Sequence, residues 1–99
     1  MLKINDIKLI DNNKILCFFN TGEKRIFNVT SIINEENKFS IKLNQPHIFK
    51  KAKVGLFGEI YWDGIAEMKD YEGKTIPCEY DVSPEFVYQN SDLFSEIEN

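Results

Sequence analysis

At 99 residues the chain can form one domain with a buried core. With 42% hydrophobic and 28% charged residues and a net charge of −4, it has the composition of a soluble globular domain, which excludes a disordered or collagen-like chain. The longest apolar run, Ile15–Phe19, is too short to span a membrane, and the first six residues lack the apolar stretch of a signal peptide, so we expect a cytoplasmic protein.

The chain opens with three predicted strands. Residues 2–10 and 14–19 are separated by an Asp-Asn-Asn segment that tolerates turn conformations. The next segment, Asn20-Thr21-Gly22, suits a three-residue turn with Gly22 in the left-handed conformation and Phe19 opposite Glu23. The sequence therefore predicts an antiparallel meander.

In this register both faces of the meander are apolar. One face carries Ile15, Cys17, Phe19, Arg25, Phe27 and Val29, and the other carries Leu16, Phe18 and Ile26. We therefore expect helices to cover one face, and the C-terminal segment or a partner to cover the other. Cys17 and Cys78 are isolated thiols, which indicates a reducing compartment rather than a disulfide between them.

The middle of the chain predicts short turns. Residues 30–37 combine a helical turn with a polar loop, and Pro46 begins a further helical turn. Within residues 38–43, Phe39 and Leu43 suit one face of a brief helix, but apolar residues also alternate as in a strand. Both interpretations remain open for that segment.

A second hairpin is predicted around Gly55-Leu56-Phe57-Gly58, with residues 51–54 and 59–62 as its strands. Residues 64–79 carry turn signals and little periodicity, so they predict a long excursion from the fold. Such a segment is uncommon unless it is functional or packs on itself.

The clearest helix signal begins at Ser83, a good N-cap, which is followed by Pro84 and Glu85 at positions that favour a first helical turn. This helix should run to about Asn90, with a short turn or a frayed end after it. The sequence thus predicts one α+β domain over residues 1–91, built on a mostly antiparallel sheet of about five strands with short helical turns and a C-terminal helix. Residues 92–99 are predicted to form an acidic C-terminal tail.

The first hairpin, together with Phe49-Lys50-Lys51, Ile60-Tyr61-Trp62-Asp63 and the segment from Asp81 to Tyr88, resembles a family of small bacterial proteins called domain of unknown function 2442. The resemblance spans residues 4–91 and is carried by Ile15, Cys17, Phe19, Gly22, Glu23, Phe27, Val29, Phe49, Trp62, Asp81 and Tyr88. Asn28 departs from it, because the family prefers Asp there, and so do residues 64–79, which separate Trp62 from the final helix.

No activity is attached to that family. The resemblance implies a small α+β fold. It also implies a regulatory or toxin–antitoxin-like setting, because family members are often encoded beside another very small protein. The chain would then be the acidic partner in a two-component system.

The sequence shows no catalytic constellation, metal-ligand spacing or phosphate-binding loop, so we expect no enzyme activity and no cofactor. The single histidine, His47, has no cysteine or second histidine near it. Carboxylates crowd one region, however, which leaves a metal-binding or enzymatic domain as an alternative. They are Asp63, Glu67, Asp70, Glu72, Glu79 and Asp81.

Charge is distributed unevenly along the chain. Residues 1–53 contain ten Lys or Arg and five Asp or Glu, whereas residues 54–99 contain two and eleven, so the two halves carry +5 and −9. Lys50, Lys51 and Lys53 form a basic patch that could contact phosphate weakly. An isoelectric point near 5.0 opposes direct nucleic-acid binding.

Aromatic residues interleaved with the acidic ones favour a protein partner, since charge steers encounter and aromatic burial supplies affinity. The candidate partner-binding residues are Phe57, Tyr71, Tyr80, Tyr88, Leu93 and Phe94. We therefore predict a non-enzymatic binding or regulatory module. The sequence indicates neither the identity of the partner nor the oligomeric state.

Overall fold

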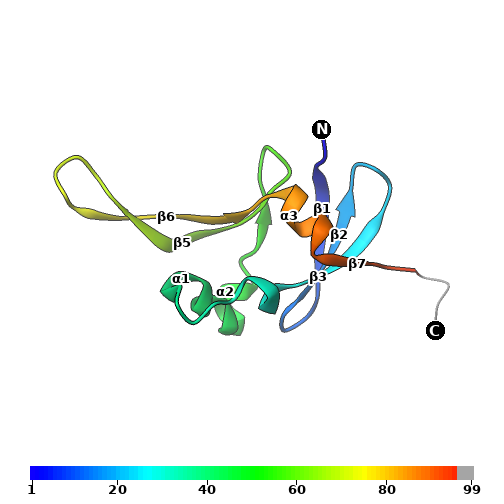
Figure 1. Ribbon diagram of the computed structural model, residues 1–99, viewed down its shortest axis with the longest axis horizontal. Coiled ribbons are helices and arrows are strands. Elements are labelled where there is room, and N and C mark those ends of the chain that lie inside the picture. The colour runs from blue at the N-terminus through cyan, green and yellow to red at the C-terminus, as the bar shows by residue number, and fades with distance from the viewer. Residues whose placement is uncertain (96–99) are drawn as a thin grey trace.

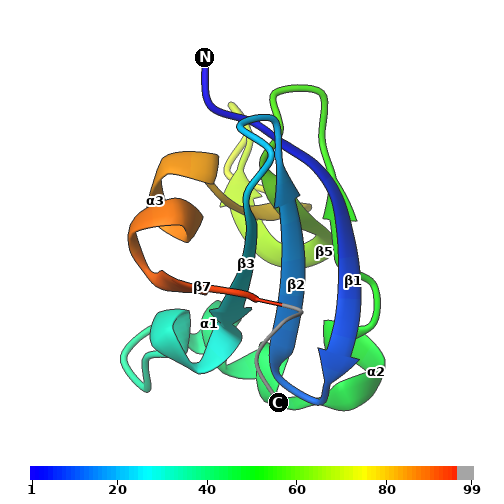
Figure 2. The same ribbon diagram turned by 90° about the vertical axis from the view of Figure 1, so that its right-hand side faces the viewer.

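Two antiparallel sheets form the frame of the molecule, which the computed structural model describes over residues 1–95 (Figure 1). The first sheet has the order β1-β2-β3-β7, with bounds Ile4–Asp11, Lys14–Phe19, Lys24–Asn28 and Ser91–Leu93 (Figure 2). The second has the order β4-β5-β6, with bounds Lys53–Val54, Ile60–Lys69 and Thr75–Val82. The predicted α+β class with antiparallel strands is confirmed, although the strands are divided between two sheets.

The predicted meander is confirmed in its register. Ile15 pairs with Phe27 across β2 and β3, and the amide of Phe19 donates to the carbonyl of Glu23 at 2.9 Å. Gly22 has a φ of 93°, the left-handed conformation that the three-residue turn requires. The face of β2 predicted to carry Ile15, Cys17 and Phe19 is buried.

The core lies between the two sheets. Its largest member, Trp62 on β5, is fully buried and donates its indole N–H to the carbonyl of Phe49 at 3.1 Å. Cys17 is a free, fully buried thiol, and loss of hydration raises its pKa to about 12. On the opposite face of the first sheet Leu16 is buried and Phe18 and Ile26 are half-buried, although none of the three belongs to this core cluster. The expectation that the C-terminal segment or a partner covers that face remains a prediction.

Short helices connect the two sheets. They are η1 (Val29–Ile32), α1 (Lys38–Ile41), η2 (Lys42–Asn44) and α2 (Pro46–Phe49). Of the two interpretations open for residues 38–43, the helical one is correct. The side chain of Asn37 caps α1, because it accepts hydrogen bonds from the amides of Phe39 and Ser40. None of the helices in residues 1–95 is long and apolar enough to cross a membrane.

The C-terminal helix α3 (Pro84–Gln89) begins as predicted, with the hydroxyl of Ser83 accepting from the amide of Phe86 at 3.1 Å. The prediction of a tail over residues 92–99 is wrong at its start. Asp92 and Leu93 belong to β7, and the next amide, that of Phe94, donates to the carbonyl of Lys24 at 2.8 Å. A strand forms here because β3 offers an unpaired edge. Residues 96–99 lie outside the described residues.

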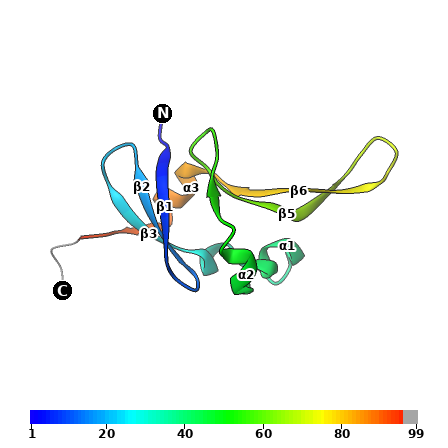
Figure 3. The same cartoon turned by 180° about the vertical axis from the view of Figure 1, so that it is seen from behind.

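The long excursion predicted at residues 64–79 is present, but it is built of paired strands and not of a loop. These residues form the distal part of the β5–β6 hairpin, which projects from the body as an arm and gives the molecule a longest dimension of 54 Å (Figures 1 and 3). Trp62 lies opposite Tyr80, and the next pair along the arm is Ala66 with Cys78. The register of the two strands therefore shifts between these pairs, and residues 63–65 form a bulge in β5. In both views α1 lies on the β5 side of the arm.

Candidate protein-binding site

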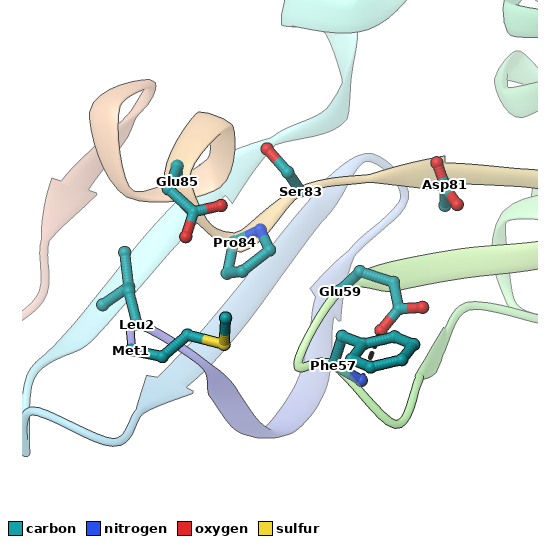
Figure 4. Close-up of a pocket in the computed structure, with 8 residues that line it drawn as sticks. All are labelled: Met1, Leu2, Phe57, Glu59, Asp81, Ser83, Pro84 and Glu85. Atoms are coloured by element: carbon teal, nitrogen blue, oxygen red, sulfur yellow. Dashed lines mark hydrogen bonds between the residues drawn. The ribbon is translucent and has the colours of Figure 1, made fainter.

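A hollow opens where the N-terminal residues, the β4–β5 turn and the start of α3 come together (Figure 4). Its volume is about 330 Å³, and it is open to solvent. Its lining combines apolar side chains with carboxylates. The residues are Met1, Leu2, Phe57, Glu59, Asp81, Ser83, Pro84 and Glu85.

The β4–β5 turn that carries Phe57 is held firmly. The amide of Gly55 donates to the carbonyl of Glu59 at 2.8 Å, and the carbonyl of Gly58 accepts from the amide of Ile4 at 3.1 Å. Gly58 has a φ of 77°, and a Cβ built there would lie 2.5 Å from the Cβ of Lys3. Only glycine therefore lets this turn lie against β1.

Phe57 and Glu59 are fixed relative to each other inside the hollow. The amide of Phe57 donates to Oε1 of Glu59 at 3.0 Å, drawn as a dashed line in Figure 4. The Phe57 ring itself is 70% exposed. The turn thus presents an aromatic surface beside an ordered carboxylate.

Three carboxylates lie close together, and two of them, Glu59 and Asp81, line the hollow. Glu59, Glu79 and Asp81 each bring one oxygen to within 4.8 Å of the others. Glu79 and Asp81 are exposed on β6, and Glu59 is half-buried just before β5. Such a group attracts cations, whether an oxygen-seeking divalent ion or the head group of a lysine or arginine.

The apolar lining favours a bound group that also has hydrocarbon surface. Leu2, Phe57 and Pro84 offer hydrocarbon surface next to the carboxylates. A lysine or arginine side chain matches both, because its methylene stem packs on apolar surface while its charged end stays with acidic groups. The hollow can therefore bind a long cationic side chain.

Comparison of the chain with protein-family models, with curated proteins and with solved structures found no match in any of the three. Its function is therefore inferred from its own residues. From the sequence, Phe57 is predicted to bind a partner and Asp81 belongs to the carboxylates of the metal-binding alternative, whereas Glu59 and Pro84 are not assigned to any site. The Gly-Leu-Phe-Gly-Glu turn was the available signal, since its glycines fix where Phe57 and Glu59 lie.

The structure does not bring the predicted partner-binding residues together. Phe57 lies in the hollow, Tyr71 is fully exposed at the tip of the arm, and Leu93 is 63% exposed on β7. These three positions belong to different parts of the molecule. They cannot form one contact patch.

The other predicted partner-binding residues have contacts within the chain. Tyr88 packs edge-on against Phe19, with ring centroids 5.4 Å apart. Tyr80 is half-buried beside Trp62, 6.4 Å between centroids, and the half-buried Phe94 extends the pairing with β3. These residues stabilise the fold more than they present a surface.

The predicted basic patch is partly neutralised. Lys50 and Lys51 are exposed, but the ammonium of Lys53 lies 3.2 Å from the carboxylate of Asp63. His47 is exposed and lines a depression together with Lys51 and Asp63. An acidic group within the patch weakens the case for phosphate binding there.

Proposed function

We propose that this chain is a non-enzymatic protein-binding module whose hollow receives a lysine or arginine side chain of a basic partner. One observation carries the proposal. The exposed Phe57 ring and the carboxylates of Glu59 and Asp81 line a single hollow together with the apolar side chains of Leu2 and Pro84. Arginine in particular is enriched among the residues that dominate binding energy at protein interfaces.

The charge of the whole chain supports this choice of partner. The hollow belongs mostly to residues 54–99, which carry a net charge of −9. A field of this sign attracts a basic surface over a distance and accelerates association. The same field repels nucleic acid.

The cellular setting is part of the proposal. We infer a regulatory, antitoxin-like role in the cytoplasm, with membership in the domain of unknown function 2442 family. Free Cys17 and Cys78 fit a reducing compartment. A small acidic protein that masks a basic partner needs only a recognition surface, which the hollow supplies.

Affinity purification from the cells that naturally make the chain tests this function. The bait carries Asp81→Asn and Glu85→Gln in the hollow. A matched control with Glu35→Gln and Glu36→Gln, at exposed positions elsewhere, has the same net charge. We expect wild type and control to recover the same basic protein and the hollow variant to lose it. Equal recovery by all three baits, or a recovered partner without a basic surface, would contradict the proposal.

The proximity of Glu59, Glu79 and Asp81 supports a second candidate, a divalent-cation site. Binding to the folded state would raise the melting temperature as Ca²⁺ or Mg²⁺ is added. Asp81→Asn should abolish that rise. An unchanged melting temperature up to about 10 mM of either ion would remove this candidate.

A further inference from the structure

The arm carries an apolar strip that emerges from the core. Cross-strand pairs on one of its faces are Trp62 with Tyr80, Ala66 with Cys78, and Met68 with Ile76. Exposure rises along the strip, from 0% at Trp62 to 53% at Met68 and 38% at Ile76. The distal part of the strip is therefore apolar surface that faces solvent.

The tip of the arm is an ordered turn that displays one aromatic ring. Oδ1 of Asp70 accepts from the amides of Glu72 and Lys74, both at 2.9 Å, and Gly73 has a φ of 81°. Tyr71 is fully exposed between these fixed residues. A rigid turn presents the ring at little cost in conformational entropy.

A groove next to the tip can accept such a ring. It lies between α1 and the arm, has a volume of about 340 Å³, and is lined by Lys38, Phe39, Glu67, Met68, Lys69 and Thr75. The half-buried Phe39 ring and the thioether of Met68 provide apolar contact. The Lys38 ammonium lies 5.2 Å from the Phe39 ring and adds positive charge to the wall.

We propose that the arm binds a second copy of this chain, with Tyr71 of each copy inserted into the groove of the other about a two-fold axis. The projecting ring and the groove lie only a few residues apart on the same arm, so one two-fold contact satisfies both at once. Charge agrees with this pairing. Glu72, next to Tyr71, lies 3.6 Å from the ammonium of Lys74 in its own chain, where both side chains are exposed, and would also face Lys38 of the second copy.

The contact is small. Each aromatic ring buries roughly 150–250 Å², and Met68 and Ile76 add to it, which places the interface among weak or transient ones. The dimer should therefore form and dissociate with concentration. This association is independent of the hollow, whose residues take no part in it.

Sedimentation velocity from about 5 to 500 µM tests the proposal. We expect the weight-average mass to rise toward a dimer in wild type. Tyr71→Ser should weaken association at least about tenfold. Phe57→Ser, which removes the other exposed aromatic ring at a turn, should leave association unchanged while impairing the hollow.

A charge exchange identifies the contact. Lys38→Glu should weaken the dimer, and adding Glu72→Lys to that variant should restore it. A monomer at every concentration would overturn the proposal, even if the chain captured another protein through its arm. A dimer that is insensitive to Tyr71→Ser and Lys38→Glu would overturn it as well.

Discussion

The hydroxyl of Tyr88 donates a 2.7 Å hydrogen bond to the carboxylate of Glu23, although 65 positions separate the two residues in the chain. The guanidinium of Arg25 completes the cluster, 3.3 Å from that carboxylate and 4.5 Å from the Tyr88 ring centroid. The hydrogen bond from Tyr88 is the main reason that the pKa of Glu23 lies below its ordinary value of 4.5. These contacts tie α3 to the β2–β3 turn.

The Tyr88→Phe variant removes this hydrogen bond, so we expect lower stability at neutral pH. Because the pKa of Glu23 is lower in the folded chain than in the unfolded one, its stabilising contribution is complete above about pH 4.5 and is lost as pH falls through the folded-state value. Urea unfolding of both proteins at about pH 7 and pH 3 checks this. A stability difference that is the same at both pH values would show that the Glu23 carboxylate is not involved.

Gly58 and Gly73 allow a matched test of the turn that shapes the hollow. Both have positive φ, but a Cβ at Gly58 would meet the backbone of Lys3 and Ile4, whereas one at Gly73 meets nothing within 4 Å. Gly73→Ala should cost about 1 kcal/mol from the left-handed conformation alone, and Gly58→Ala should cost at least about 2 kcal/mol. Equal losses in the free energy of unfolding would mean that the turn does not press on β1.

We expect that the arm can be removed without loss of the fold. The side chains of residues 67–77 are exposed apart from the half-buried Asp70. Replacement of residues 68–76 by an Asn-Gly turn should change the free energy of unfolding by less than about 1 kcal/mol and abolish self-association. Urea denaturation and sedimentation of the shortened chain measure the two effects. An unfolded product would show that the arm is part of the core.

The two thiols should differ in reactivity. Cys17 is 0% exposed, and burial raises its pKa to about 12, whereas Cys78 is half-buried on β6. A thiol reagent such as dithiobisnitrobenzoate should modify one thiol per native chain at pH 8, and the second only in denaturant. Cys78→Ser should leave the native chain unreactive. Rapid modification of both thiols in the native chain would contradict the buried position of Cys17.

Local signals predicted the first hairpin and α3 well. The alternation around Gly22 and the Ser83 N-cap act over a few residues, so the sequence alone contains them. Asn28 also acts only on residues near it in the sequence. Its side chain accepts from the amide of Thr30 and caps η1, a role that Asp fills equally well.

The hairpin of the arm was not predicted, although its turn has the same spacing as the turn between β2 and β3. Asn20-Thr21-Gly22 and Tyr71-Glu72-Gly73 both place glycine third in a three-residue turn. The strands beside the second turn show little periodicity for two reasons. The bulge at residues 63–65 breaks the alternation, and most of the arm is exposed on both faces, which removes the contrast between buried and exposed positions.

The hollow could not be predicted from the sequence, for a different reason. Its walls come from residues 1–2, 57–59 and 81–85, which only the completed fold brings together. Single-residue patterns indicate that Phe57 sits in a turn and that Asp81 precedes a helix. They carry no information on the distance between the two.

Chemical-shift mapping with acetyl-arginine amide tests the central claim most directly, since this probe is a single cationic side chain with blocked ends. Millimolar additions should shift the amide signals of Phe57, Glu59 and Asp81 more than those of the acidic arm tip, Asp70 and Glu72. The shifts should disappear in Asp81→Asn and shrink at high salt. Equal shifts at the arm tip and the hollow, or none at the hollow, would contradict the account.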